Sequence, residues 1–234
     1  MKLKFAAIIL PVFAVLASTA HAATPLLIDF STVAGAQSDW ETIGAGAPIS
    51  SPGDQMEVFS GYTDLSAGNI TVTVENLEFN RRYDNGGAND DLFGTDLDAM
   101  YGDMLLRNDG DATLDVTISG LQAGTFQITT YHLQQVNTPS LFDLIVTDDS
   151  GTASVGNFAM GQGDTASIFN PTIITFDVVS NGTDDIILQM DETTAGTGGN
   201  TGGWLGMNGM QIIPEPSSLA LLGLGGLLLL RRRR

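Results

Sequence analysis

The chain is 234 residues long and strongly acidic, with 27 Asp and Glu against nine Lys and Arg and a formal charge of −18. This charge disfavours nucleic acid and anionic membrane surfaces as partners, because like charges repel. The absence of cysteine excludes disulfide bonds, thiolate metal sites and cysteine-based catalysis.

The N-terminus carries a predicted secretory signal peptide, residues 1–22. Its charged start holds two lysines, residues 5–16 are apolar, and residues 20–22 read Ala-His-Ala, a small-x-small cleavage pattern. We expect the secretion translocon to export the chain and cleavage to follow Ala22. A retained N-terminal anchor is the alternative, which the short apolar run disfavours. Cleavage leaves His132 as the one remaining histidine and excludes zinc sites built on two or three histidines.

Residues 23–213 are predicted to fold as one exported domain with a sizeable core. This segment contains three arginines and 26 carboxylates, so its formal charge is −23. Without disulfide bonds, its stability has to come from the core. The acidic surface serves solubility or binds divalent cations, and solubility is the favoured interpretation.

The domain is predicted to be all-β, a jelly-roll-like antiparallel β-sandwich. Apolar and polar residues alternate over 70–75 and again over 114–118, so that one face of each strand lies in the core. Glycine-rich turns at 119–124, 148–151 and 180–183 separate short apolar runs, as in a sandwich. The predicted strands are 26–30, 70–75, 114–118, 126–130, 142–147, 172–179, 184–190 and 204–213.

One segment departs from this period. Over residues 90–104, apolar residues fall at helical spacing, at 92, 93, 97, 100, 101 and 104. Asp90 or Asp91 would cap the start. We therefore expect one short helix across an end of the sandwich.

Two segments, 83–91 and 193–203, are predicted to be loops with room for a ligand. Exposed aromatic rings with polar side chains beside them are a common means of ligand binding by loops. The candidate ligand-binding residues are Trp40, Tyr83 and Trp204, with Tyr62 as a further aromatic. A core role is the alternative for each. Tyr83, between Arg82 and Asp84 in a glycine-rich segment, is the one most expected to be exposed.

No catalytic residue is predicted. His132 follows a strand and would have to serve any Ser-His-Asp triad, but no G-x-S-x-G turn is present, and a structural role is favoured. The acidic residues at 84, 90, 91, 96, 98 and 103 could supply a glycosidase carboxylate pair, although helix capping and a solvated face explain them as well. No cofactor and no specific metal site are predicted, and a structural calcium stays open, because Ca²⁺ takes six to eight oxygen ligands.

The C-terminus joins three elements: Pro214-Glu215-Pro216, an uncharged apolar run over residues 217–230, and an arginine block. Proline disfavours continuation of any strand before it. The apolar run predicts a transmembrane-like helix, and terminal arginines hold their end in the cytoplasm. A tail packed on the domain is the alternative, disfavoured by the four charges. The arginine block is Arg231, Arg232, Arg233 and Arg234.

This tail, residues 214–234, resembles the PEP-CTERM sorting signal of Gram-negative bacteria, which implies an exosortase as partner. The resemblance also implies export across the inner membrane, transient anchoring there, and delivery to the cell surface or outside the cell. The tail does not indicate what the domain itself does.

The domain is similar to secreted galactose-binding-like jelly rolls, including carbohydrate-binding modules and malectin-like domains. The similarity rests on Ile28-Asp-Phe30, Trp40, Leu97-Asp98, residues 119–126 with Tyr131-His132, and a closing Asn208-Gly-Met-Gln-Ile212. It implies a non-catalytic structural or carbohydrate-binding protein of the cell surface or exopolysaccharide matrix. A secreted enzyme that acts on polysaccharide through carboxylates is the alternative.

Overall fold

A computed structural model describes residues 25–30, 41–42, 54–62, 70–77, 79–82, 103–107, 113–133, 140–163, 169–194 and 205–215. These residues all belong to one compact unit, Ala23–Ser217. Among them, no helix is long and apolar enough to span a membrane. The predicted signal peptide and the predicted apolar C-terminal helix lie outside the described residues.

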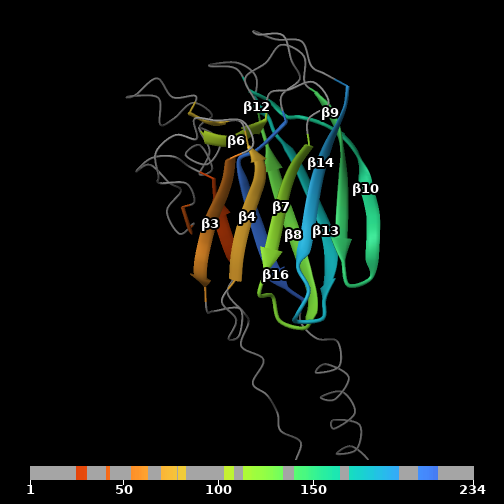
Figure 1. The fold of residues 1–234 in the computed structure, drawn as a ribbon. Helices are drawn as coiled ribbons and strands as arrows, with labels where there is room; N and C mark the ends of the chain where they lie inside the picture. Colours follow the sequence, from red (N-terminus) through yellow and green to blue (C-terminus); the bar gives the residue numbers. More distant parts are fainter. Residues whose placement is uncertain are drawn as a thin grey trace, which may run out of the picture. The chain divides into compact units, whose positions relative to one another are not determined.

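Two antiparallel sheets form the sandwich, and Figure 1 shows β3, β4, β7 and β14 in a layer in front of β16, β8 and β13. The five-stranded sheet has the order β13 (Thr172–Ser180), β8 (Gly124–His132), β16 (Gly209–Pro214), β1 (Leu26–Asp29) and β2 (Glu41–Thr42). The six-stranded sheet has the order β10 (Gly151–Ala159), β9 (Leu141–Asp148), β14 (Ile186–Thr194), β7 (Thr113–Ser119), β4 (Ile70–Leu77) and β3 (Asp54–Tyr62). The pairing of β1 with β2 is parallel.

Two smaller sheets accompany the sandwich. The three-stranded one has the order β15 (Leu205–Met207), β6 (Asp103–Arg107) and β5 (Phe79–Arg82). The other pairs β11 (Gln162–Gly163) with β12 (Phe169–Asn170).

The core lies between the two larger sheets and follows from the alternating sequence. In β7, Leu114, Val116 and Ile118 are fully buried, while the residues between them are half-buried on the opposite face. Ile128 of β8 and Ile212 of β16 are fully buried in the same core cluster. Each such side chain contributes about 1.5–3 kcal/mol to folding. The predicted all-β antiparallel sandwich is confirmed.

The strands predicted from alternation are present, and the predicted turns at 148–151 and 180–183 join β9 to β10 and β13 to β14. The run 204–213, predicted as one strand, is divided at Asn208 into β15 and β16. Sequence reasoning missed β10, because this edge strand is largely exposed and has no apolar alternation. It also missed β3, β5, β6 and the short pairs.

The helix predicted over residues 90–104 cannot include its last two residues. Asp103 and Met104 begin β6 and pair with Arg82 and Arg81 of β5. Three consecutive apolar residues, 104–106, favour a strand paired on both sides, here with β5 and β15. Residues 90–102 lie outside the described residues.

The prediction that Pro214-Glu215-Pro216 follows the last strand is wrong at its first residue. Pro214 is the last residue of β16 and lies opposite Phe126 of β8. The backbone N–H of Glu215 then donates to the carbonyl oxygen of Thr125, with an N···O distance of 2.9 Å. The folded sheet therefore overlaps the C-terminal motif.

The backbone packed around Gly161 leaves no room for a side chain. A Cβ built there would lie 2.3 Å from the carbonyl oxygen of His132 and 2.6 Å from the backbone nitrogen of Thr172. These are backbone atoms of a paired β8–β13 position and cannot rotate away. We expect Gly161→Ala to lower the free energy of unfolding by about 2 kcal/mol or more. Urea unfolding measures the loss, with the exposed change Ala159→Ser as control, expected within about 0.5 kcal/mol of wild type. Equal stability of the two variants would contradict this account.

Candidate functional site

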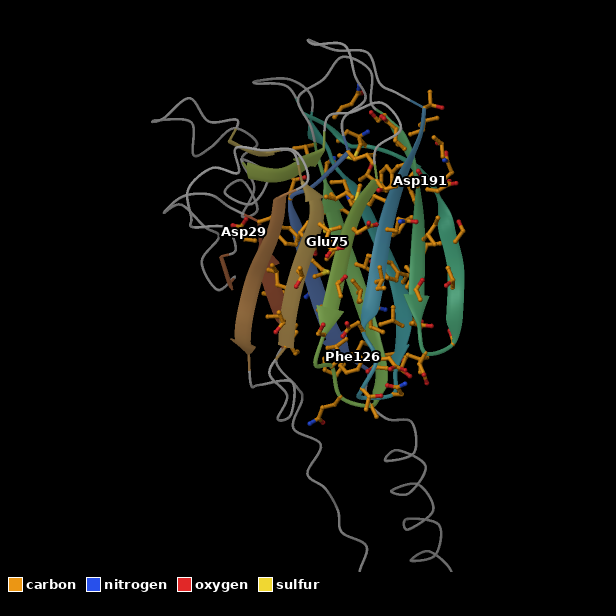
Figure 2. The ribbon with its side chains drawn as sticks, in the orientation of Figure 1. Asp29, Glu75, Phe126 and Asp191 are labelled. Atoms are coloured by element: carbon orange, nitrogen blue, oxygen red, sulfur yellow. The ribbon has the colours of Figure 1, made fainter. Side chains whose placement is uncertain are left out.

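The strand register gives the sandwich two distinct ends. Leu26 pairs with Ile212 and Phe126 with Pro214, so one end carries the start of β1 and the C-terminal motif. We call this the motif end. Asp29 pairs with Gly209 at the other end, which we call the loop end and which also carries His132, Leu141 and Thr194. Figure 2 shows Phe126 near one end of the sheets and Asp191 toward the other.

The three aromatic residues predicted to bind ligand, Trp40, Tyr83 and Trp204, lie outside the described residues. The described residues beside Tyr83 and Trp204 lie at the loop end. β2, which begins at Glu41 next to Trp40, runs parallel to β1 and therefore begins on the side of the motif end. Trp40 stands between Phe30 and Glu41, which pairs with Ile28. Trp204 stands between Thr194, at the end of β14, and β15.

The segment that contains Tyr83 also begins and ends beside this end of the sandwich. It leaves β5 after Arg82 and returns at Asp103 of β6, and these two residues pair. β6 in turn pairs with β15, which leads through Asn208 into β16. Chain segments far apart in sequence therefore meet at the loop end.

A cluster of buried polar groups lies inside the sandwich at the loop end, with His132 at its centre. The ring is fully buried, with Nδ1 at 2.8 Å from the carbonyl oxygen of Gly206 and Nε2 at 2.8 Å from Oγ1 of Thr130. A carbonyl oxygen can only accept, so Nδ1 carries the proton in the neutral ring and Nε2 accepts from the threonine hydroxyl. The ring also packs on Phe142, with 5.2 Å between centroids.

Asn208 joins three strands within the same cluster. Its side-chain Oδ1 accepts from the backbone N–H of Leu133 at 2.5 Å, and its own N–H donates to the carbonyl oxygen of Tyr131 at 2.8 Å. Its carbonyl oxygen accepts from the N–H of Phe30 at 3.0 Å. The side chain is fully buried. The division between β15 and β16 is therefore held by hydrogen bonds to Phe30, which follows β1, to Tyr131 of β8, and to Leu133, which follows β8.

The burial and hydrogen bonds of His132 disfavour a role as a catalytic base. Both ring nitrogens are engaged and no part of the ring reaches solvent. A general base has to lie within hydrogen-bonding reach of a substrate proton. His132 is a structural residue in this arrangement.

The outer face of the six-stranded sheet is polar and acidic. Glu75 lies directly opposite Asp115, and Asp191 lies opposite Asp143. Oδ1 of Asp115 accepts from Nε2 of Gln189 at 3.0 Å, so this face already uses hydrogen bonds among its own side chains. Within the described ranges, no group of three or more His, Asp or Glu side chains could hold a metal ion. Of the clustered acidic residues 84–103, Asp103 alone is described, in β6, so nothing here tests whether they bind a structural calcium.

Burial of the neutral His132 ring predicts a specific loss of stability in acid. Desolvation lowers the pKa of His132 from 6.5 to about 4, against the smaller opposing effect of the hydrogen bond to Gly206. Between these values the unfolded chain binds a proton that the folded chain does not. The stability from the neutral ring is complete above pH 6.5 and is lost as the pH falls to about 4. The loss is roughly 3 kcal/mol, at 1.36 kcal/mol for each pH unit.

Urea unfolding of wild type and His132→Gln at a series of pH values between 7 and 4 measures this loss. The variant is expected to be less stable at pH 7 and to have the shallower decline, because the many carboxylates titrate in both proteins. Parallel declines would show that the ring does not control acid stability.

Residues 213–234 match the family model described as the PEP-CTERM protein-sorting motif. No curated protein shows a significant sequence match to the chain. The extracellular domain of ANXUR2 from Arabidopsis thaliana is a similar solved structure, with 13% identity and a TM-score of 0.39 over 70% of this chain. The match spans 55% of that chain, so little more than half of the receptor domain is covered.

Two carbohydrate-binding modules are similar at the same distant level. CBM35 from Cellvibrio japonicus Abf62 has 14% identity and a TM-score of 0.33, over 49% of this chain and 76% of that one. TmCBM61, solved in complex with beta-1,4-galactotriose, has 13% identity and a TM-score of 0.33, over 65% and 92%. These likenesses are too distant to bear on what this chain binds. The chain thus carries a PEP-CTERM protein-sorting motif, residues 213–234, whose first two residues are also the last two of the antiparallel β-sandwich.

Proposed function

We propose that this is an exported protein, held in the inner membrane by its C-terminal tail until an exosortase processes it. It then reaches the cell surface or the exopolysaccharide matrix, where its sandwich acts as a structural or carbohydrate-binding module without catalysis. The match of residues 213–234 to the sorting motif supports the first half of this proposal.

The second half of the proposal, the role of the sandwich, rests on the separation of its two ends. The sorting motif leaves from the motif end, whereas the described residues beside Tyr83 and Trp204 lie at the loop end. Several aromatic rings on neighbouring loops are what a sugar-stacking platform needs. A ligand bound at the loop end leaves the motif end free for membrane and exosortase.

The chemistry of the chain supports binding over turnover. Acyl-transfer catalysis needs an activated nucleophile, and this chain has no cysteine and a fully buried His132. Polysaccharide hydrolysis by two carboxylates is the second candidate, through Asp96 or Asp98, which lie outside the described residues. A domain of charge −23 gains nothing electrostatically from acidic glycans, so neutral polysaccharides are the preferred ligands.

Carbohydrate binding is tested with residues 23–215 on a panel of neutral and acidic polysaccharides. Tyr83→Ala is expected to weaken binding about two- to tenfold, the worth of one stacked ring, and to leave the melting temperature unchanged. His132→Ala is the matched contrast, because it should lower the melting temperature and weaken binding less than Tyr83→Ala does. Unchanged affinity in Tyr83→Ala, or hydrolysis that is lost in Asp96→Ala or Asp98→Ala, would move the protein to the enzyme class.

Sorting is tested by Glu215→Ala in cells that contain the exosortase. The side chain of Glu215 is exposed and alanine keeps its backbone N–H, so the bond to Thr125 and the fold are expected to persist. The variant should accumulate unprocessed in the inner membrane, as measured by fractionation. Asp185→Ala, an equal loss of charge at another exposed position, is the control and should be sorted normally. Normal release of Glu215→Ala would count against the proposal.

A further inference from the structure

The last strand of the sandwich runs into the sorting motif without a linker. β16 lies between β8 and β1 in the five-stranded sheet, and its pairing with β8 continues to Pro214 opposite Phe126. The N–H of Glu215 adds one more ladder bond, to the carbonyl oxygen of Thr125 at 2.9 Å. The peptide bond between Pro214 and Glu215 is thus part of the sheet.

The position of Pro214 in this strand has a simple physical reason. Successive N–H groups of a strand point to opposite sides, and that of Glu215 points to β8. Position 214 therefore faces the β1 side. There, β1 begins at Leu26, opposite Ile212, so among the described residues none pairs with Pro214 on that side. Within the described part of the sheet, the missing N–H of proline thus costs no ladder bond, and the pairing with β8 extends into the motif.

Withdrawal of the chain upstream of Glu215 is costly, and its cost rises steeply with each residue. Freeing Glu215 alone breaks one backbone hydrogen bond, worth about 0.5–1.5 kcal/mol. Freeing the chain back to Ile212 pulls a fully buried side chain from the core and breaks pairing on both sides, with β8 and with β1. A protease that needs an extended peptide cannot take up β16 unless the sandwich opens.

We propose that the sheet fixes the upstream limit of the processing site, so that the chain is cut C-terminal to Glu215 and β16 stays whole in the mature protein. In the hydrolytic step, the peptide C–N bond at Glu215–Pro216 or a later bond breaks. The acyl carbon gains an oxygen from water, and the departing nitrogen takes the proton. The inference rests on the proposed processing by an exosortase.

The cut is located on full-length protein recovered from cells that contain the exosortase. Met210 is the last methionine of the chain, so cyanogen bromide releases a C-terminal fragment that starts at Gln211. Mass spectrometry of this fragment is expected to show Glu215 retained and the terminal arginines absent. A fragment that ends at Ile213 or Pro214 overturns the inference. A fragment that still contains Arg231–Arg234 overturns the proposed processing itself, which keeps the two failures distinct.

A second variant tests whether the sheet, and not the enzyme alone, sets the limit. Insertion of Gly-Gly-Ser-Gly between Ile213 and Pro214 separates the motif from the ladder and keeps every core residue of β16. Processing, followed by pulse-chase, should become about two- to tenfold faster, because the bond of Glu215 to Thr125 no longer has to open before the exosortase binds the motif upstream of its cut. The same insertion between Asp149 and Ser150, in the β9–β10 turn, is the control and should leave the rate unchanged. An unchanged rate with the motif freed overturns the inference.

Discussion

The pairing of β16 between β1 and β8 is the constraint on which both ends of the molecule depend. It brings the last strand of the sandwich against the first, so that Leu26 and Ile212 share a register position although nearly the whole domain separates them in sequence. The same strand ends in the sorting motif at one end and begins at Asn208, beside the buried polar cluster, at the other. Since the chain has no disulfide bond, this closure depends on backbone pairing, on the apolar core and on the side-chain hydrogen bonds of the polar cluster.

The polar cluster at the loop end shows how a core tolerates groups that are costly to bury. His132 stays neutral, and each ring nitrogen meets a partner of the opposite kind, the carbonyl of Gly206 and the hydroxyl of Thr130. These hydrogen bonds fix the position of β15 relative to β8. β15 directly follows Trp204, one of the predicted aromatic residues. Buried polar networks that are fully paired fix one arrangement more firmly than apolar packing does.

The sequence predicted what depends on local periodicity and missed what depends on strand neighbours. Strands β4, β7 and β13 alternate because one face is buried, and each was predictable. β10 has no such face, and it exists because β9 offers it a partner. The pattern that predicted a helix up to Met104 belongs partly to β6, which needs β5 and β15 beside it. Of the candidate site, the tail was recognisable from composition, whereas the burial of His132 followed from contacts distant in sequence.

At Pro214, the arrangement of the sheet overrides an expectation based on residue type alone. Proline is expected to end a strand because it cannot donate to a ladder. That rule applies only where a neighbouring strand would accept the bond, and β1 begins two register positions away on the side that Pro214 faces. The motif is consequently both the end of the fold and the start of the sorting signal. Under the proposed processing, the tail is removed without loss of a core strand only if the chain is cut beyond the last ladder bond, so the position of this strand end decides whether release and stability are compatible.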